Sequence, residues 1–277
     1  MTLAVPTPPL RLKTPPARQG VIWVRQGFRV FSARPLAFTA LLAAFLFGAM
    51  LLLALPIVGS MLVLMAVPLL TLVFQLATRA ALDGRVPTPA LFVAALRGDA
   101  RRTRLLVQLG VGYAIATLFI VTFSDWVDGG AMRALEDALG SGRPDEVQAV
   151  LEQPDLQLGM LLRLSLAALL SLPFWHAPAL VYWGGQGAAQ ALFSSLLACW
   201  RARNALVVYG LGWALLGTLF ALLATVVFSL LGSREMIGIA ALPAGLMFST
   251  AFYASLYFTF VDSFESQPDT TSAIEAG

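Results

Sequence analysis

Six long apolar runs dominate this sequence and restrict the chain to one environment, the interior of a lipid bilayer. A helix rises about 1.5 Å per residue, so roughly 20 residues cross the roughly 30 Å hydrocarbon layer. Each run is long enough to do so. We therefore predict an all-α, polytopic membrane bundle of six transmembrane helices. The predicted spans cover residues 36–55, 57–82, 105–123, 158–182, 205–231 and 236–261.

Composition excludes a soluble domain. Hydrophobic residues make up 58% of the chain and charged residues 12%, whereas soluble domains carry about 25% charged residues. The first run follows a Pro-rich stretch and is longer than the apolar part of a cleavable signal, so we expect it to be a retained span. The single cysteine, Cys199, excludes a disulfide within the chain and a metal site built from cysteines.

Basic residues gather on one side of the predicted membrane domain. Most of the 18 Lys and Arg residues lie in residues 11–34, 79–104 and 201–203, which share one side if the spans alternate. Basic flanks are retained in the cytoplasm, so we expect both termini there. Each basic residue near the surface also attracts anionic headgroups by about 1 kcal/mol. The expected partners are therefore lipids of the anionic inner leaflet, and nucleic acid is not expected.

Amphipathic helices are predicted before three of the spans. In two of them apolar residues recur at intervals of three or four, with polar or basic residues on the opposite face. These stripes are Val21, Val24, Phe28 and Phe31 before the first span, and Ala189, Phe193, Leu196 and Trp200 before the fifth. Residues 89–97 form a weaker example before the third. Such helices are too short to cross, so we expect them to lie in the cytoplasmic headgroup layer as elbow helices.

Two weaker patterns concern how the spans are arranged. The segments 31–35 and 200–204 match aromatic to aromatic, Ala to Ala and Arg to Arg, which indicates a parallel repeat of elbow-plus-hairpin units, with chance similarity as the alternative. Small residues also recur at every fourth position within spans, a spacing typical of closely packed membrane helices. Examples are Ala40, Ala44 and Gly48, Gly112 and Ala116, Gly210 and Ala214, and Ala241 and Gly245. We therefore expect a compact bundle.

The membrane domain is predicted to cover residues 21–261, between a disordered, Pro-rich cytoplasmic tail at residues 1–20 and a cytoplasmic tail at residues 262–277. Its longest connection, residues 124–157, is acidic and is expected outside. Apolar spacing there predicts two short helices, separated by Gly140 to Gly142 and the second started by Pro144. The acidic residues lack the alternating spacing of a calcium loop, so solvated helices are expected.

Pro173 and Pro178 are predicted to disturb the fourth span near its cytoplasmic end, because each removes a backbone donor. Between them lie Trp175 and His176, the only histidine. Two interpretations stay open: interfacial aromatic residues around a hydrogen-bonded imidazole, or a binding or gating site in a kinked, polar pocket. With one histidine and no carboxylate within reach in the sequence, neither a zinc site nor a Ser-His-Asp triad can be assembled in the spans.

Two further polar residues within spans are candidate ligand contacts. Arg163 lies about 7 Å inside the fourth span; it either extends its side chain to the outer interface or binds an anionic group. Gln75 lies deeper, in the second span, where a hydrogen bond to a neighbouring helix explains it without a ligand. No span carries an interior Asp or Glu, which disfavours a proton-coupled pump. We expect no catalytic residue, cofactor or metal.

Several segments carry a resemblance to known proteins. They are residues 23–29, 34–35, 174–180, 199–204, 208–210 and 254–262. With them the chain resembles a family of uncharacterised bacterial six-span inner-membrane proteins that have a Trp/Phe-x-Ala-Pro-Ala-Leu-Val motif. That family is similar to the membrane domain of some glycerophosphodiester phosphodiesterases. The resemblance implies fold and location but no activity, and His176 departs from the apolar or aromatic residue expected at its position.

These patterns favour an integral inner-membrane protein that is not an enzyme, a lipid-interacting or scaffold component. The alternative is a transporter or flippase-like carrier of a small amphiphile that uses the disturbed fourth span. Lipid is the expected partner in both cases, and a second copy of the chain or another membrane protein is an open alternative partner. An intramembrane enzyme is least favoured, because the residue pairs for catalysis are missing.

Overall fold

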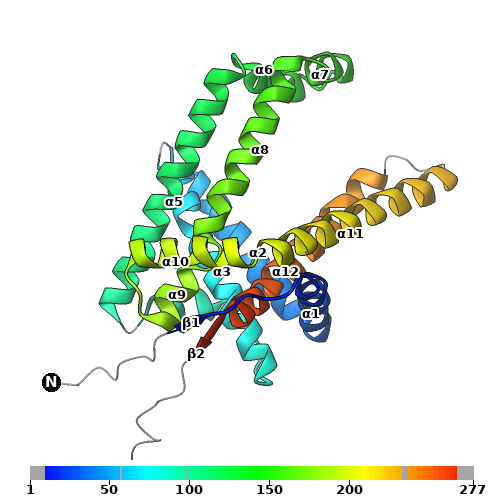
Figure 1. Ribbon diagram of the computed structural model, residues 1–277. Helices are drawn as coiled ribbons and strands as arrows, with labels where there is room; N and C mark the ends of the chain where they lie inside the picture. Colours follow the sequence, from blue (N-terminus) through cyan, green and yellow to red (C-terminus); the bar gives the residue numbers. More distant parts are fainter. Residues whose placement is uncertain (1–9, 57, 98, 233–235, 267–277) are drawn as a thin grey trace, which may run out of the picture.

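The computed structural model describes residues 10–56, 58–97, 99–232 and 236–266, and helices account for most of them (Figure 1). Six helical segments are long and apolar enough to cross a membrane. They are α2 (Pro35–Leu53), α3 (Gly59–Leu82), α5 (Ala100–Val127), the pair α8 (Pro154–Phe174) and α9 (Ala177–Gly184), α11 (Arg203–Leu230) and α12 (Met236–Ser263). The prediction of an all-α protein with six candidate spans is confirmed.

Shorter helices connect these segments. The helices that precede α2, α5 and α11 are α1 (Gln19–Ala33), α4 (Ala90–Leu96) and α10 (Ala188–Arg201). Their position in a headgroup layer stays a prediction. In the acidic connection, α6 (Ala131–Ser141) and α7 (Pro144–Leu151) are the two predicted helices. They are separated at Gly142, whose φ of 68° is the left-handed conformation that glycine adopts most readily.

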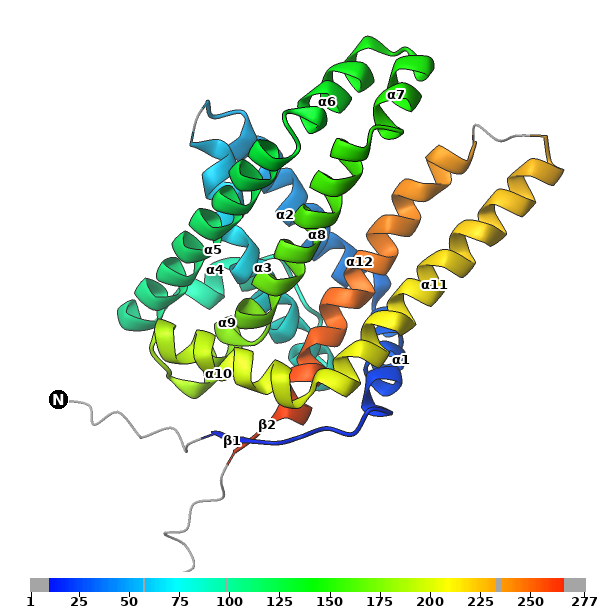
Figure 2. The same cartoon turned by 45° about the horizontal axis from the view of Figure 1, so that its top comes forward.

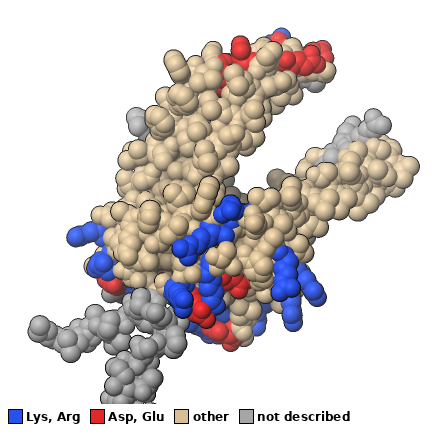
Figure 3. Space-filling model, in the orientation of Figure 1, with Lys and Arg blue, Asp and Glu red and all other residues tan. Residues whose placement is uncertain are grey.

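The long helices form two arms that diverge from a common base. One arm is the α5–α8 hairpin with α6 and α7 at its tip, and the other is the α11–α12 hairpin (Figures 1 and 2). At the base α3 packs against both α5 and α12, and α10 lies across α8. The space-filling view shows an open cleft between the arms (Figure 3).

The compact bundle predicted from small-residue spacing is therefore wrong. A Cβ added at Gly48, Gly210 or Gly245 would meet no atom within 4 Å. The closest helix contacts use other glycines instead. At Gly110 of α5, an added Cβ would lie 2.5 Å from the carbonyl oxygen of Met65 on α3. Spacing alone identifies residues that permit close packing, but it does not identify which of them face a neighbour.

Helix α1 packs against α11 and α12. A Cβ added at Gly27 would lie 2.5 Å from that of Ser255 on α12, so only glycine allows this approach. Within the predicted apolar stripe of α1, Val24 and Phe31 are buried in the protein and Val21 is 59% exposed. The buried face of α1 also includes Trp23, which is fully buried against α11 and contacts the ring of Tyr209.

A short antiparallel ribbon joins the two described ends of the chain. Strand β1 (Leu10–Leu12) pairs with β2 (Phe264–Ser266), and Lys13 forms an ion pair of 3.1 Å with Glu265. The prediction of a disordered tail is therefore wrong for residues 10–20, because Leu10 and Leu12 pack against the core and their backbone pairs with β2. Residues 1–9 and 267–277 of the two predicted tails lie outside the described residues.

Candidate functional site

The fourth span is broken where its prolines predict. Helix α8 ends at Phe174, one residue after Pro173, and Trp175 and His176 form a turn. Pro178 lies in the first turn of α9, where the N–H it lacks has no partner within the helix. The break places Trp175 in the walls of two cavities and buries His176.

Helix α10 satisfies the backbone that the break exposes. The hydroxyl of Ser195 accepts a hydrogen bond of 2.9 Å from the backbone N–H of His176 and donates one of 2.8 Å to the carbonyl of Leu172. The thiol of Cys199, one turn further along α10, lies 3.5 Å from the same carbonyl. Burial raises the pKa of the Cys199 thiol to about 12. Within a membrane, such side-chain partners make a helix break tolerable.

His176 is buried, with 1% of its surface exposed. Its imidazole packs against the rings of Phe260 and Phe264, at centroid distances of 5.9 and 5.5 Å. Among the described residues Nδ1 has no hydrogen-bond partner, so the hydrogen-bonded imidazole of the first interpretation is not seen at that atom. Within the described ranges, no group of three or more His, Cys, Asp or Glu residues is arranged to hold a metal ion.

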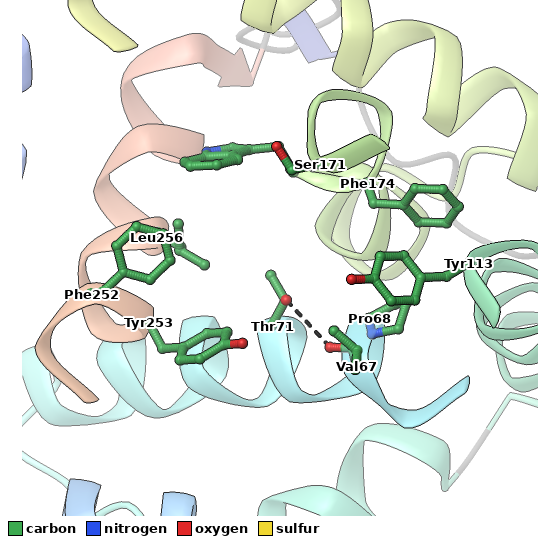
Figure 4. Close-up of a pocket in the computed structure, with 10 residues that line it drawn as sticks. Val67, Pro68, Thr71, Tyr113, Ser171, Phe174, Phe252, Tyr253 and Leu256 are labelled. Carbon is green, nitrogen blue, oxygen red and sulfur yellow. Dashed lines mark hydrogen bonds between the residues drawn. The ribbon is translucent and has the colours of Figure 1, made fainter. Parts of the chain in front are cut away.

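Trp175 faces the cleft. Its indole N–H donates a hydrogen bond of 3.2 Å to Thr259 of α12, and its ring meets Tyr209 and Phe252 edge-on. Two cavities meet at this indole. One, of about 170 Å³, lies between α3, α5, α8 and α12 (Figure 4). The other, of about 410 Å³, lies between α8, α10, α11 and α12 and includes Arg203 in its wall.

A third cavity, of about 470 Å³, lies against α11 and α12 and shares Trp213 and Phe252 with the second. Apolar and aromatic side chains form most of these walls, and Phe252 lines all three cavities. A pocket of this kind, mostly apolar with a few polar groups, is typical of ligand sites. The arrangement can hold an apolar or amphiphilic molecule that enters sideways from the membrane.

Arg163 lies far from the break in the fourth span. It is 13 residues before His176, about 20 Å by helical rise. Its guanidinium forms an ion pair of 2.5 Å with Asp125 of α5 and lies 3.5 Å from Asp128. The structure therefore gives Arg163 two protein partners, which neither interpretation of the sequence included.

Asp128 corrects the prediction that the acidic connection is solvated throughout. Its side chain is 1% exposed and accepts a hydrogen bond of 2.9 Å from the backbone N–H of Gly130. Gly159 of α8 makes room for it, since a Cβ there would lie 2.5 Å from that of Asp128. The ion pair with Arg163 thus joins α5 to α8 at the outer end of their arm.

Gln75 is completely buried in α3. Among the described residues neither its side-chain oxygen nor its nitrogen has a hydrogen-bond partner, so the predicted bond to a neighbouring helix is absent. One turn away, Thr78 makes such a bond instead, donating to the carbonyl of Ala254 at 3.0 Å. Gln75 lines none of the cavities described above.

Sequence reasoning missed several hydroxyl groups. Thr71, Tyr113, Ser171 and Tyr253 line the cavity in Figure 4, and they come from four different helices. Nothing in the local sequence distinguishes them from other hydroxyl residues in the spans. Their mutual position depends on how the helices pack, which the sequence pattern did not predict.

The long apolar helices, the broken fourth span and the cleft define a multi-pass membrane protein. Over 260 residues the chain is 31% identical to BTH_II0599, a probable inner membrane protein of Burkholderia thailandensis, and the match covers 91% of this chain and 93% of that protein. The chain belongs to the family of this probable inner membrane protein, which supports a bacterial inner-membrane location. No protein-family model and no solved structure matches the chain.

Proposed function

We propose that this protein is a non-enzymatic, lipid-interacting component of the bacterial inner membrane, with both termini in the cytoplasm. The observation that carries the proposal is the separation of charge along the molecule. Lys and Arg side chains predominate at the base, where some acidic side chains and the described ends of the chain also lie, and acidic side chains predominate at the tip formed by α6 and α7 (Figure 3). The basic end is the cytoplasmic end by the rule that basic flanks are retained inside.

Helix α10 supports contact with the inner leaflet. Phe193 is 68% exposed and Trp200 is 67% exposed, although both are large and apolar. Arg201 follows directly, and the guanidinium of Arg203 lies over the ring of Trp200, 5.4 Å from its centroid. Exposed aromatic rings beside arginines suit the boundary between acyl chains and anionic headgroups. In this proposal the elbow helices hold the protein against that leaflet.

The proposal also includes the resemblance of the sequence to the membrane domain of some glycerophosphodiester phosphodiesterases. The Trp-x-Ala-Pro-Ala-Leu-Val motif covers residues 175–181, which form the turn at the break and the first part of α9. We propose that this break is the feature shared with the membrane domain of glycerophosphodiester phosphodiesterases. Membrane lipids are the proposed partners, and a second copy of the chain or another membrane protein is the alternative.

Lipid retention tests the main proposal. The double variant Arg25→Gln/Arg29→Gln removes two exposed charges from α1, and Arg133→Gln/Arg143→Gln removes two from the outer tip. Native mass spectrometry of protein extracted from membranes rich in phosphatidylglycerol should show fewer bound anionic lipids for the first variant and no change for the second. Equal retention by both variants would contradict the proposal, as would turnover of a lipid by the purified protein.

A carrier of a small amphiphile is the second candidate function. The break at Trp175 and His176, together with the cavity of about 410 Å³ beside it, favours this alternative, because interrupted helices often line transport sites. Vesicles containing the wild-type protein should then move a labelled lipid between leaflets, and Pro178→Ala should slow that movement. Wild-type vesicles that move no labelled lipid faster than empty vesicles would exclude a carrier.

A further inference from the structure

The cavity in Figure 4 differs from the other cavities of the cleft in its polar groups. In the figure the hydroxyls of Thr71, Tyr113 and Tyr253 point into a common space between α3, α5 and α12. Ser171 contributes a fourth hydroxyl from α8. None of the ten described residues that line this space is charged. Four hydroxyl groups and no ionic group indicate a ligand that has oxygen atoms but no charge.

Depth in the membrane supports an uncharged ligand. Thr71 lies 12 residues after the start of α3 at Gly59, and Tyr113 lies 13 residues after the start of α5 at Ala100. Each distance is about 18–20 Å by helical rise, so the space lies near the middle of the bilayer. An ionised headgroup is disfavoured at this depth.

Two of these hydroxyl groups, on Thr71 and Tyr253, are available to a ligand, whereas the hydroxyl of Ser171 donates a hydrogen bond of 2.7 Å to the carbonyl of Ala168. Tyr253 has no hydrogen-bond partner for its hydroxyl among the described residues, and Thr71 makes only a long bond of 3.4 Å to the carbonyl of Val67 in its own helix. Both can therefore donate to carbonyl or ether oxygens. The space of about 170 Å³ compares with the roughly 150 Å³ cavity that admits benzene, so it holds one six-membered ring.

The cleft leaves room for an apolar tail. The hydroxyl-lined space shares Ser171 and Trp175 with the cavity beside α10, and Phe252 and Tyr253 with the cavity between α11 and α12. If the head of a lipid occupied this space, its tail could therefore extend through the neighbouring apolar cavities towards the cleft between the two arms (Figure 3).

We propose that this space binds the uncharged, oxygen-bearing head of a lipid whose tail lies in the cleft. A quinone ring and the ester head of a diacylglycerol share this chemistry, and the size of the space fits the single ring better. The inference rests on the proposed lipid-interacting function and names the class of lipid that the cleft takes.

Binding of three probes to the purified full chain tests this inference. A short-chain benzoquinone, detected by quenching of tryptophan fluorescence, should bind saturably, because Trp175 is part of the wall. Dioctanoylglycerol should compete with the quinone if the space accepts ester heads and should not compete if it accepts only rings. Short-chain phosphatidylglycerol should fail to compete. Non-saturable quenching in the wild type, or competition by the charged lipid, would overturn the inference.

Matched variants locate the site. Thr71→Val/Tyr253→Phe removes two hydroxyls from the space, whereas Thr225→Val/Tyr257→Phe removes the same two groups elsewhere in α11 and α12. Losing two hydrogen bonds should weaken quinone binding about tenfold in the first variant and leave the second unchanged. Equal affinity of the two variants would overturn the assignment.

A further measurement on the wild type guards against misfolding of the variant. A photoactivatable quinone should label peptides of α3 or α12, and labelling confined to other helices would contradict the site. Retention of phosphatidylglycerol, measured on the same samples, should be equal in both hydroxyl variants. The two failures can therefore be told apart. Unchanged retention of anionic lipid by Arg25→Gln/Arg29→Gln would contradict the main lipid proposal, whereas unchanged quinone binding by Thr71→Val/Tyr253→Phe would contradict this inference.

Discussion

At the scale of single residues, the membrane domain depends on polar side chains that find partners on distant parts of the chain. Asp262 accepts hydrogen bonds from Trp23 at 2.7 Å and from Gln19 at 2.6 Å. Tyr209 and Ser255 share a hydrogen bond of 2.5 Å. Each of these contacts connects α1 or α11 to α12, and each satisfies a group that would be costly to bury alone.

The pair of Arg163 with Asp128 gives a direct test at this scale. Arg163→Gln leaves the buried Asp128 without its cation and should lower the free energy of unfolding by about 2 kcal/mol. This is less than the roughly 3–5 kcal/mol of a fully buried pair, because Arg163 is 21% exposed. Denaturant titration in mixed micelles measures the change. The control Arg133→Gln, at a side chain 77% exposed, should change the free energy by less than about 0.5 kcal/mol.

Cys199 provides a pH-dependent prediction. Because burial raises its pKa in the folded protein to about 12, above about 8.5 for a free thiol, folding is favoured below the unfolded pKa. This stabilisation should decrease as the pH rises towards 12. Folded protein in detergent should therefore react slowly with a thiol reagent at pH 8, and unfolded protein rapidly. Fast reaction of the folded form would show that Cys199 is accessible.

At the scale of helices, close approach explains which glycines matter. Gly27→Ala should lower the unfolding temperature, because the added carbon would lie 2.5 Å from Ser255 Cβ and 2.7 Å from the carbonyl oxygen of Ala251. Overpacking of this kind usually destabilises by about 1–3 kcal/mol. Gly245→Ala is the matched control: nothing lies within 4 Å, and helix propensity favours alanine by up to about 1 kcal/mol. Equal effects of the two variants would contradict the packing described for α1.

Sequence features that act over a few residues predicted the helices and the break in the fourth span. Contacts between distant parts of the chain could not be predicted from them. Run length predicted the six candidate spans, and Pro173 and Pro178 predicted the break, because both effects act within a few residues. In contrast, nothing in the local sequence distinguishes the buried Asp128 from the solvated acidic residues that follow it, because its partner Arg163 lies on α8. The hydroxyl-lined space likewise depends on helix packing, to which apolar periodicity gives no guide. Small-residue spacing failed for the same reason.

At the scale of the whole molecule, the orientation in the membrane is the main prediction. In a Cys199→Ala background, Ser141→Cys at the end of α6 and Thr88→Cys before α4 introduce exposed thiols at opposite ends of the protein. An impermeant maleimide should label Ser141→Cys in cells whose outer membrane has been permeabilised and should label Thr88→Cys only after lysis. The reverse pattern would place the basic end outside and refute the proposed topology.

The ribbon formed by β1 and β2 makes the polypeptide a nearly closed ring. Residues 10 and 266 are direct partners in it although almost the whole chain separates them. Halves of a split fluorescent reporter fused to the two ends would therefore start from neighbouring anchor points and should reassemble within one molecule. For the same reason, joining the ends with a short linker and opening the chain at residues 83–89 should yield a circular permutant with the same membrane domain.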